Sequence, residues 1–249
     1  MPIYLSGPNP PLRLEPDEVQ VWRIALEDAG LPGDARVELL AEAYAYLTAE
    51  ERERAARMRA GAPRDEFVAG RGCLRWLLGA VVGVRPECVE LELGPHGKPE
   101  LAAGGVWFNV AHSRGMVLIA VSRAGEVGVD VEWVDAAIEA REIAEGSFHP
   151  LDVARIAGAA AGSERAAEFY RCWTRKEAVA KADGRGLTLA LAGFATGADD
   201  MSEQTVEVPG VPEPFFVRGI EVGSGHLGAL AATRAGVAVR LMDLAPAKG

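Results

Sequence analysis

The chain has 249 residues, of which 49% are hydrophobic and 25% charged, and its formal net charge is −10. This length supports one large domain or two small ones around a sizeable core. The negative charge repels nucleic acid and anionic membranes, so we expect neither as a partner, and an anionic ligand would need a local basic site.

Three further features predict a cytoplasmic protein. No run of 18 apolar residues occurs, so no membrane span is expected. The start, M-P-I-Y-L-S-G-P-N-P, lacks a basic stretch followed by an apolar one, so no secretory signal is expected. Cys73, Cys88 and Cys172 are scattered without metal-binding spacing, which is typical of reduced thiols.

The first half of the chain mixes helical and strand patterns. Strand patterns fall at residues 19–26, 88–92, 105–110 and 116–122. Helical patterns fall at residues 35–46, 48–59 and 65–83. Thr48 and Glu51 fit a capping box that opens the second of these helices. The third helix is amphipathic, with Arg71 and Arg75 on a stripe apart from its apolar side chains.

The second half begins with a strand at residues 127–133, which we expect to pair with 116–122 across a short turn. A helical pattern then dominates residues 136–183, with breaks near Pro150 and at residues 158–162. The segment D-G-R-G ends the last helix. Further strands are predicted at residues 205–208, 214–221, 227–233 and 237–242.

A short internal repeat suggests how the halves are related. Residues 116–125 read M-V-L-I-A-V-S-R-A-G, and residues 227–236 read L-G-A-L-A-A-T-R-A-G. We therefore predict an α+β fold of two similar halves, residues 1–122 and 123–249, related by a pseudo-twofold axis. Each half would hold an antiparallel sheet packed by helices, and a cleft between the halves would be a natural ligand site.

Two short motifs carry most of the chemistry: G-V-D-V-E at 128–132 and W-T-R-K-E-A-V-A-K at 173–181. On a strand, Asp130 and Glu132 leave the same face, and on a helix Glu177 and Lys181 share one face. Three carboxylates around one point would hold a hard divalent cation such as Mg²⁺. Each motif alone also fits a solvated strand edge or an exposed ion pair.

A basic segment offers a site for an anion. Residues 52–75 carry seven arginines against three acidic residues. The arginines are Arg52, Arg54, Arg57, Arg59, Arg64, Arg71 and Arg75. A solvated helix face is the alternative interpretation of those before residue 65.

The two motifs, about 40 residues apart and in this order, resemble the paired signature of the 4'-phosphopantetheinyl transferases. The type resembled is the larger, surfactin-synthetase-activating one, whose single chain holds two pseudo-symmetric halves. G-K-P at 97–99, F-N-V-A-H-S at 108–113 and G-R-G-L at 184–187 also match family motifs in order and spacing. The resemblance covers most of residues 48–187.

This resemblance implies transfer of phosphopantetheine from coenzyme A to a serine of an apo acyl or peptidyl carrier protein. Adenosine 3',5'-bisphosphate would be released, and the protein would be a monomer. The implied Mg²⁺ ligands are Asp130, Glu132 and Glu177, and Lys181 would reach a phosphate oxygen. The residues implied to hold the nucleotide part of coenzyme A, including its 3'-phosphate, are Arg71, Lys98 and His112. Arg52 and Arg54 are further candidates for this contact, although the family often has lysines nearby.

Two positions depart from the family pattern. Asp152 aligns where the family usually places a glutamate, and it is our candidate for the base that accepts the serine proton. Ala111 stands where the family commonly has a serine, which predicts the loss of one hydrogen bond to a phosphate. The alternatives are a Mg²⁺-dependent hydrolase of coenzyme A-like pyrophosphates and a non-catalytic relative that binds the carrier.

Overall fold

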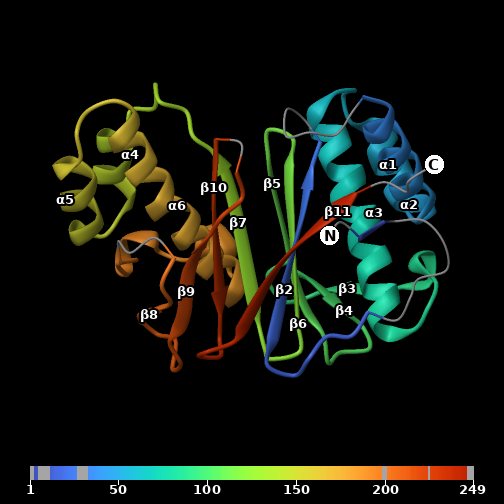
Figure 1. Cartoon of the computed structure of the whole chain (residues 1–249). Coiled ribbons are helices and arrows are strands. Elements are labelled where there is room, and N and C mark those ends of the chain that lie inside the picture. The colour runs from blue at the N-terminus through green and yellow to red at the C-terminus, as the bar shows by residue number, and fades with distance from the viewer. Residues whose placement is uncertain (1–2, 5–11, 27–32, 198–200, 224, 246–249) are drawn as a thin grey trace. The chain divides into compact units, whose positions relative to one another are not determined.

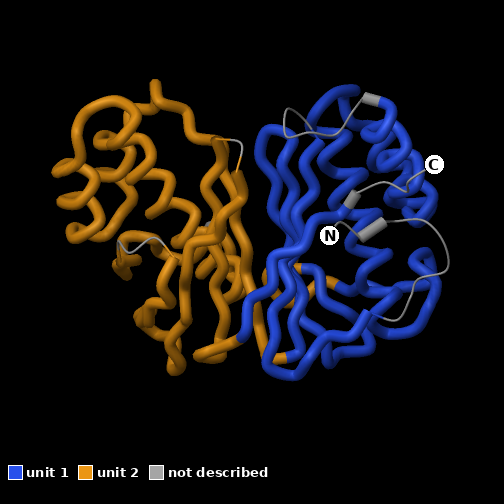
Figure 2. Tube along the Cα trace, in the orientation of Figure 1, with its two compact units in different colours: residues 1–92, 99–123, 238–249 blue, residues 93–98, 124–237 orange. Residues whose placement is uncertain are grey.

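The computed structural model describes residues 3–4, 12–26, 33–197, 201–223 and 225–245. The chain forms two compact units (Figure 2). Unit 1 comprises residues 1–92, 99–123 and 238–249, and unit 2 comprises residues 93–98 and 124–237. The predicted halves, residues 1–122 and 123–249, differ from these units in three places. Residue 123 and the segment 238–249 belong to unit 1, and the segment 93–98 belongs to unit 2.

Unit 1 contains a five-stranded sheet in the order β1-β11-β2-β6-β5 (Figure 1). Its strands are β1 (Ile3–Tyr4), β2 (Glu18–Ala25), β5 (Trp107–Ser113), β6 (Met116–Ser122) and β11 (Ala238–Ala245). β11 runs parallel to both β2 and β1, so this sheet is mixed rather than antiparallel as predicted. No tight turn joins β11 to either neighbour, and the sequence pattern therefore left its direction open.

Three helices pack in unit 1: α1 (Gly33–Ala45), α2 (Ala49–Arg57) and α3 (Ala62–Val82). The capping box at the start of α2 is confirmed, because the Thr48 side chain accepts from the Glu51 amide while Glu51 accepts from the Thr48 amide. α3 packs against β5 and β6, and Trp22, Trp76 and Ile119 are fully buried in this core. The predicted strand at 88–92 is instead a 3-10 turn, η1 (Pro86–Cys88), followed by β3 (Leu91–Leu93), which pairs with β4 (Pro99–Leu101).

Unit 2 contains an antiparallel sheet in the order β7-β10-β9-β8. Its strands are β7 (Val127–Trp133), β8 (Gln204–Val206), β9 (Phe215–Ile220) and β10 (His226–Ala232). The predicted pairing of 116–122 with 127–133 is wrong, because β6 pairs with β2 and β5, whereas β7 pairs with β10. Every residue of β6 is buried, so no alternation of polar and apolar side chains could indicate its partner.

Three helices also pack in unit 2: α4 (Ala140–Ser147), α5 (Pro150–Gly158) and α6 (Ser163–Asp183). The 3-10 turns η2 (Gly186–Thr188) and η3 (Leu191–Gly193) follow α6. α6 covers one face of the sheet, contacting β7, β10 and β9 (Figure 1). It ends at Gly184, whose φ of 89° is the left-handed conformation typical of a glycine cap.

The two segments of the internal repeat contain β6 and β10, which are interior strands of the two different sheets. Each sheet is packed by a helix of 21 residues, α3 in unit 1 and α6 in unit 2. The mixed α+β architecture is as predicted, and the pseudo-twofold relation stays a prediction. In the described part of the chain, no helix is long and apolar enough to cross a membrane.

Gly128 allows α6 to lie directly on β7. A Cβ at this position would stand 2.0 Å from the Ala178 carbonyl oxygen and 2.4 Å from the Ala182 nitrogen. Both atoms belong to the helix backbone, which cannot turn aside as a flexible side chain would. The absence of a side chain at residue 128 therefore sets the distance between the strand and the helix.

We predict that Gly128→Ala lowers the free energy of unfolding by about 2 kcal/mol, because the added methyl group overpacks the helix–strand contact. Thermal and urea unfolding would measure this loss. The matched control is Gly146→Ala in α4, where an added Cβ meets nothing within 4 Å. A helical glycine in open space should become slightly more stable as alanine, and equal stabilities of the two variants would contradict the prediction.

Candidate functional site

The strand β7 and the helix α6 bring the two motifs of unit 2 together. Gly128, Asp130 and Glu132 alternate along β7 and share the face on which Gly128 touches α6. On α6, the Lys181 ammonium lies 2.6 Å from Asp130 Oδ1 and also donates to the Val129 carbonyl at 3.3 Å. The strand acid and the helix lysine are thus in direct contact.

The carboxylates of this cluster are largely removed from water. Asp130 is 5% exposed, and its Oδ2 has no hydrogen-bond partner among the described residues. Burial raises the pKa of Asp130 to about 7, which Lys181 opposes and the charges of Glu132 and Glu177 reinforce. Burial also raises the pKa of Glu177. The charge of Glu132 adds to this shift, and the charge of Lys181 opposes it. The three acids therefore lie close enough to repel one another.

The described residues contain no group of three or more His, Cys, Asp or Glu side chains already arranged to hold a metal. The donors nevertheless suit a hard cation, because they are carboxylate oxygens. Two of them, Asp130 Oδ2 and Glu177 Oε1, are buried and have no hydrogen-bond partner in the part of the chain that the structure describes. A buried unsatisfied carboxylate oxygen is costly, and a bound cation would satisfy both oxygens and relieve the mutual repulsion. The residues present therefore fit Mg²⁺.

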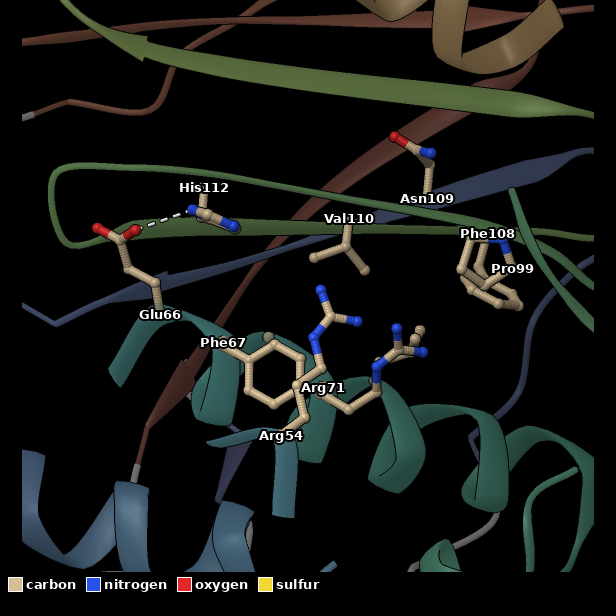
Figure 3. Close-up of a pocket in the computed structure, with 11 residues that line it drawn as sticks. Arg54, Glu66, Phe67, Arg71, Pro99, Phe108, Asn109, Val110 and His112 are labelled. Carbon is tan, nitrogen blue, oxygen red and sulfur yellow. Dashed lines mark ion pairs between the residues drawn. The ribbon is translucent and has the colours of Figure 1, made fainter. Parts of the chain in front are cut away.

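Unit 1 holds a pocket of about 240 Å³ between α3 and β5 (Figure 3). Its basic side chains are Arg54, Arg71 and His112, whereas Phe67 and Phe108 form an apolar wall. The Arg54 guanidinium lies 4.9 Å from the Phe67 ring centroid, and Arg71 Nε lies 3.5 Å from Glu51 Oε1. Burial lowers the pKa of Arg71, and the Glu51 charge opposes that shift.

The third basic side chain of the pocket is His112. Its Nδ1 lies 2.8 Å from Glu66 Oε2, as the dashed line in Figure 3 marks. Half of the His112 side chain is exposed, whereas Glu66 is buried. Each of these three basic side chains thus contacts a neighbour that orients it, an arrangement that suits recognition of a phosphorylated ligand.

Comparison with known proteins identifies the family of the chain. The 4'-phosphopantetheinyl transferase superfamily matches residues 126–231, the segment that contains Asp130, Glu132 and Glu177. The chain is 35% identical over 185 residues to the 4'-phosphopantetheinyl transferase HetI of a Nostoc species, covering 72% of this chain and 75% of HetI. The chain belongs to the 4'-phosphopantetheinyl transferase superfamily.

Other phosphopantetheinyl transferases are similar over comparable lengths. A 4'-phosphopantetheinyl transferase of Bacillus subtilis is 27% identical over 175 residues, or 70% of this chain and 76% of the relative. A phosphopantetheinyl transferase of a Thraustochytrium species is 32% identical over 190 residues, or 71% of this chain and 64% of the relative. The matches thus extend well beyond the segment that holds the carboxylates.

Two of the cations predicted for this transferase are not among the residues that line the pocket of unit 1. Arg52 is not among the residues that line it, and its guanidinium donates to the Tyr44 and Ala45 carbonyls near the end of α1. Lys98 belongs to unit 2, where its ammonium lies 2.5 Å from Glu126 Oε2 and donates to the Val127 carbonyl. Lys98 therefore adjoins the start of β7, whereas Arg52 caps a helix.

Asp152 has surroundings that do not suit a base for an external serine. It is fully buried, its Oδ2 lies 2.8 Å from the equally buried Lys176 ammonium, and its Oδ1 accepts from the Thr196 amide. Lys176 also donates to the Leu191 and Phe194 carbonyls. This buried pair ties α5 and the loop after η3 to α6, one residue from Glu177. The position of Asp152 in the sequence indicated a family acid, but the sequence could not show that this side chain is buried.

The residues that hold the pocket cations were not predicted from the sequence. Glu51 was assigned only to the capping box, yet its carboxylate also binds Arg75 through two hydrogen bonds of 2.6 and 3.1 Å. Glu66 was counted only as one of three acids among seven arginines. No local pattern could indicate these contacts, because Glu51 lies in α2 whereas its partners Arg71 and Arg75 lie in α3, and Glu66 lies in α3 whereas His112 lies in β5.

We predict that Mg²⁺ binding weakens as the pH is lowered through about 7. Asp130 must lose its proton to become a ligand, and burial raises its pKa to about 7. Below that value a proton competes with the cation, so the apparent affinity should fall about tenfold per pH unit, and above it the affinity should level off.

Isothermal titration calorimetry in buffers of different ionisation enthalpy would count the proton released on binding. Glu164→Gln, at the exposed start of the same helix, is the control and should show the same pH dependence as the unaltered protein. An affinity that does not vary between about pH 6 and 8 would rule out Asp130 as the titrating ligand.

We predict that Asp152→Asn destabilises the protein by about 3 kcal/mol, because it leaves the buried Lys176 ammonium without its counter-charge. Removing both charges, in Asp152→Leu combined with Lys176→Met, should recover most of that loss. Chemical unfolding would measure the stabilities. Turnover of folded Asp152→Asn close to that of the unaltered protein would agree with a structural carboxylate, whereas loss of turnover in fully folded protein would restore Asp152 as the base.

Proposed function

We propose that this chain transfers 4'-phosphopantetheine from coenzyme A to a serine hydroxyl of an apo carrier protein, with Mg²⁺ as its cofactor and adenosine 3',5'-bisphosphate as the second product. The observation that carries the proposal is the cluster of Asp130, Glu177 and Lys181, with two buried carboxylate oxygens unsatisfied. Its position within the segment matched by the transferase superfamily supports the same reaction.

The acidic cluster suits phosphoryl transfer, which depends mainly on positioning and on stabilising charge. Asp130, Glu132 and Glu177 would hold Mg²⁺, which when bound polarises a phosphate oxygen and takes up developing charge. Lys181 would donate to an oxygen of the coenzyme A pyrophosphate, and its contact with Asp130 already holds the ammonium at the cluster. These residues would orient the reacting phosphorus without forming a covalent intermediate.

The pocket of unit 1 would bind the nucleotide part of coenzyme A. Arg54, Arg71 and His112 offer donors to phosphate oxygens, and the phenyl rings of the wall offer apolar surface to the adenine. Ala111 lies buried in β5 and brings no hydroxyl to a ligand. Lys98 is proposed as a further phosphate ligand, and Arg52 as a more distant source of positive charge.

The serine proton needs an acceptor within hydrogen-bond reach. Because Asp152 is buried in its pair with Lys176, we assign this role to Glu177. We further propose the surfactin-synthetase-activating subtype, with pseudo-twofold halves, a monomeric state and a cytoplasmic location.

We predict that Asp130→Asn and Glu177→Gln each lower the transfer rate at least 100-fold, because each removes a proposed metal ligand. Mass spectrometry of apo carrier domains incubated with coenzyme A and Mg²⁺ would detect the added phosphopantetheine group. Glu164→Gln again provides the control on the same helix and should transfer at the normal rate. Circular dichroism would check that each variant is folded.

Two results would contradict the proposed function. Hydrolysis of coenzyme A without any carrier would point to a pyrophosphate hydrolase, whereas binding of the carrier without modification would point to a non-catalytic relative. Full activity of the combined Asp130→Asn and Glu177→Gln variant would dismiss the metal-binding role of the cluster.

A further inference from the structure

The Glu66 carboxylate uses both of its oxygens inside unit 1. Glu66 lies in the first half of α3 and is only 6% exposed. Its Oε1 accepts from the Gly115 amide at 2.6 Å, and its Oε2 lies 2.8 Å from His112 Nδ1. One buried side chain therefore connects the helix to the turn between β5 and β6 and to the histidine at the end of β5.

The turn that Glu66 binds is tight. Arg114 and Gly115 have φ angles of 42° and 80°, the left-handed values that two-residue hairpin turns require. The register places Ser113 opposite Met116, so His112 stands beside the turn, next to the last pair of the ladder. Fixing the Gly115 amide therefore also fixes the backbone from which the imidazole projects.

The contact with His112 determines what the imidazole can offer a ligand. A carboxylate at Nδ1 holds the proton on that nitrogen and fixes the plane of the ring. In Figure 3 the second ring nitrogen lies on the side away from Glu66. When the ring is protonated, this nitrogen is a charged N–H donor in the pocket that also contains Arg54 and Arg71.

We infer that Glu66 is a positioning residue that orients His112 toward the 3'-phosphate of coenzyme A. The inference rests on the proposed function, since it concerns the pocket assigned to the nucleotide. Glu66 itself does not touch the ligand in this scheme. It contacts the ring nitrogen that faces away from the ligand, as a carboxylate often does in a metal-binding histidine.

Glu66 has two opposing effects on an anionic ligand. Its own negative charge repels a phosphate, whereas its contact with Nδ1 orients the imidazole, whose second nitrogen donates to a phosphate when the ring is protonated. The imidazole lies directly against the carboxylate, so the pair places the ring toward the ligand and the carboxylate within the protein. The attraction should therefore exceed the repulsion.

The test compares two nucleotides that differ at the 3' position. Isothermal titration calorimetry would measure binding of adenosine 3',5'-bisphosphate and of AMP to the full chain, without carrier protein. Glu66→Gln should weaken binding of the bisphosphate roughly tenfold, the lower end of what loss of such a partner costs a ligating histidine. Binding of AMP should change much less, because AMP lacks the phosphate that His112 would contact.

A double-mutant cycle identifies the residue through which Glu66 acts. In a His112→Ala background, Glu66→Gln should have little further effect on bisphosphate binding. Glu66→Asp, which keeps the charge but withdraws it from the ring, should show the same selective loss as Glu66→Gln. Glu18→Gln is the matched control, because Glu18 is a buried glutamate of unit 1 that does not line the pocket.

Three results would overturn the inference: tighter bisphosphate binding by Glu66→Gln, an equal loss for both nucleotides, or an undiminished loss in the His112→Ala background. The first would mean that Glu66 only repels the ligand, and the others that it only supports the fold. Because these measurements need no transfer, a chain that modifies no carrier would disprove the proposed function while leaving this result readable.

Discussion

The contact between the strand β7 and the helix α6 is the constraint on which the proposed catalytic chemistry depends. Gly128 brings the helix backbone onto the strand, and two residues further along β7 Asp130 meets Lys181. At a larger distance between strand and helix, the carboxylates would be separate surface charges with ordinary pKa values. Close packing is what removes them from water and makes them costly unless a cation compensates.

The same helix is held from its other side by a buried ion pair. Lys176 and Asp152 are fully enclosed, and the lysine also binds two carbonyls of the following loop. Consecutive helix residues point about 100° apart. Lys176 therefore anchors the helix to the body of unit 2 while Glu177 faces the acidic cluster. The buried ion pair thus fixes the rotation of the helix that carries Glu177 and Lys181.

Much of this could be predicted from sequence because the relevant signals are local. The capping box and the periods of α3 and α6 depend on residues within a few positions of each other. So does the spacing within each of the two pairs, Asp130 with Glu132 and Glu177 with Lys181. Strand partners and burial do not. β11 joins β2 from the far end of the chain, β6 is apolar throughout, and Asp152 differs from a solvent-facing acid only through distant packing. Those features arise from long-range contacts that no short pattern encodes.

Glu51 connects the folding of a short helix to the order of the pocket. Its carboxylate caps the first turn of α2 and at the same time binds Arg75 and contacts Arg71. A nucleotide that binds only when Arg71 is in place must therefore favour the state in which α2 is formed. Binding of a nucleotide in the pocket would then slow amide hydrogen exchange at the backbone of residues 49–57. Of that helix, only Arg54 lines the pocket.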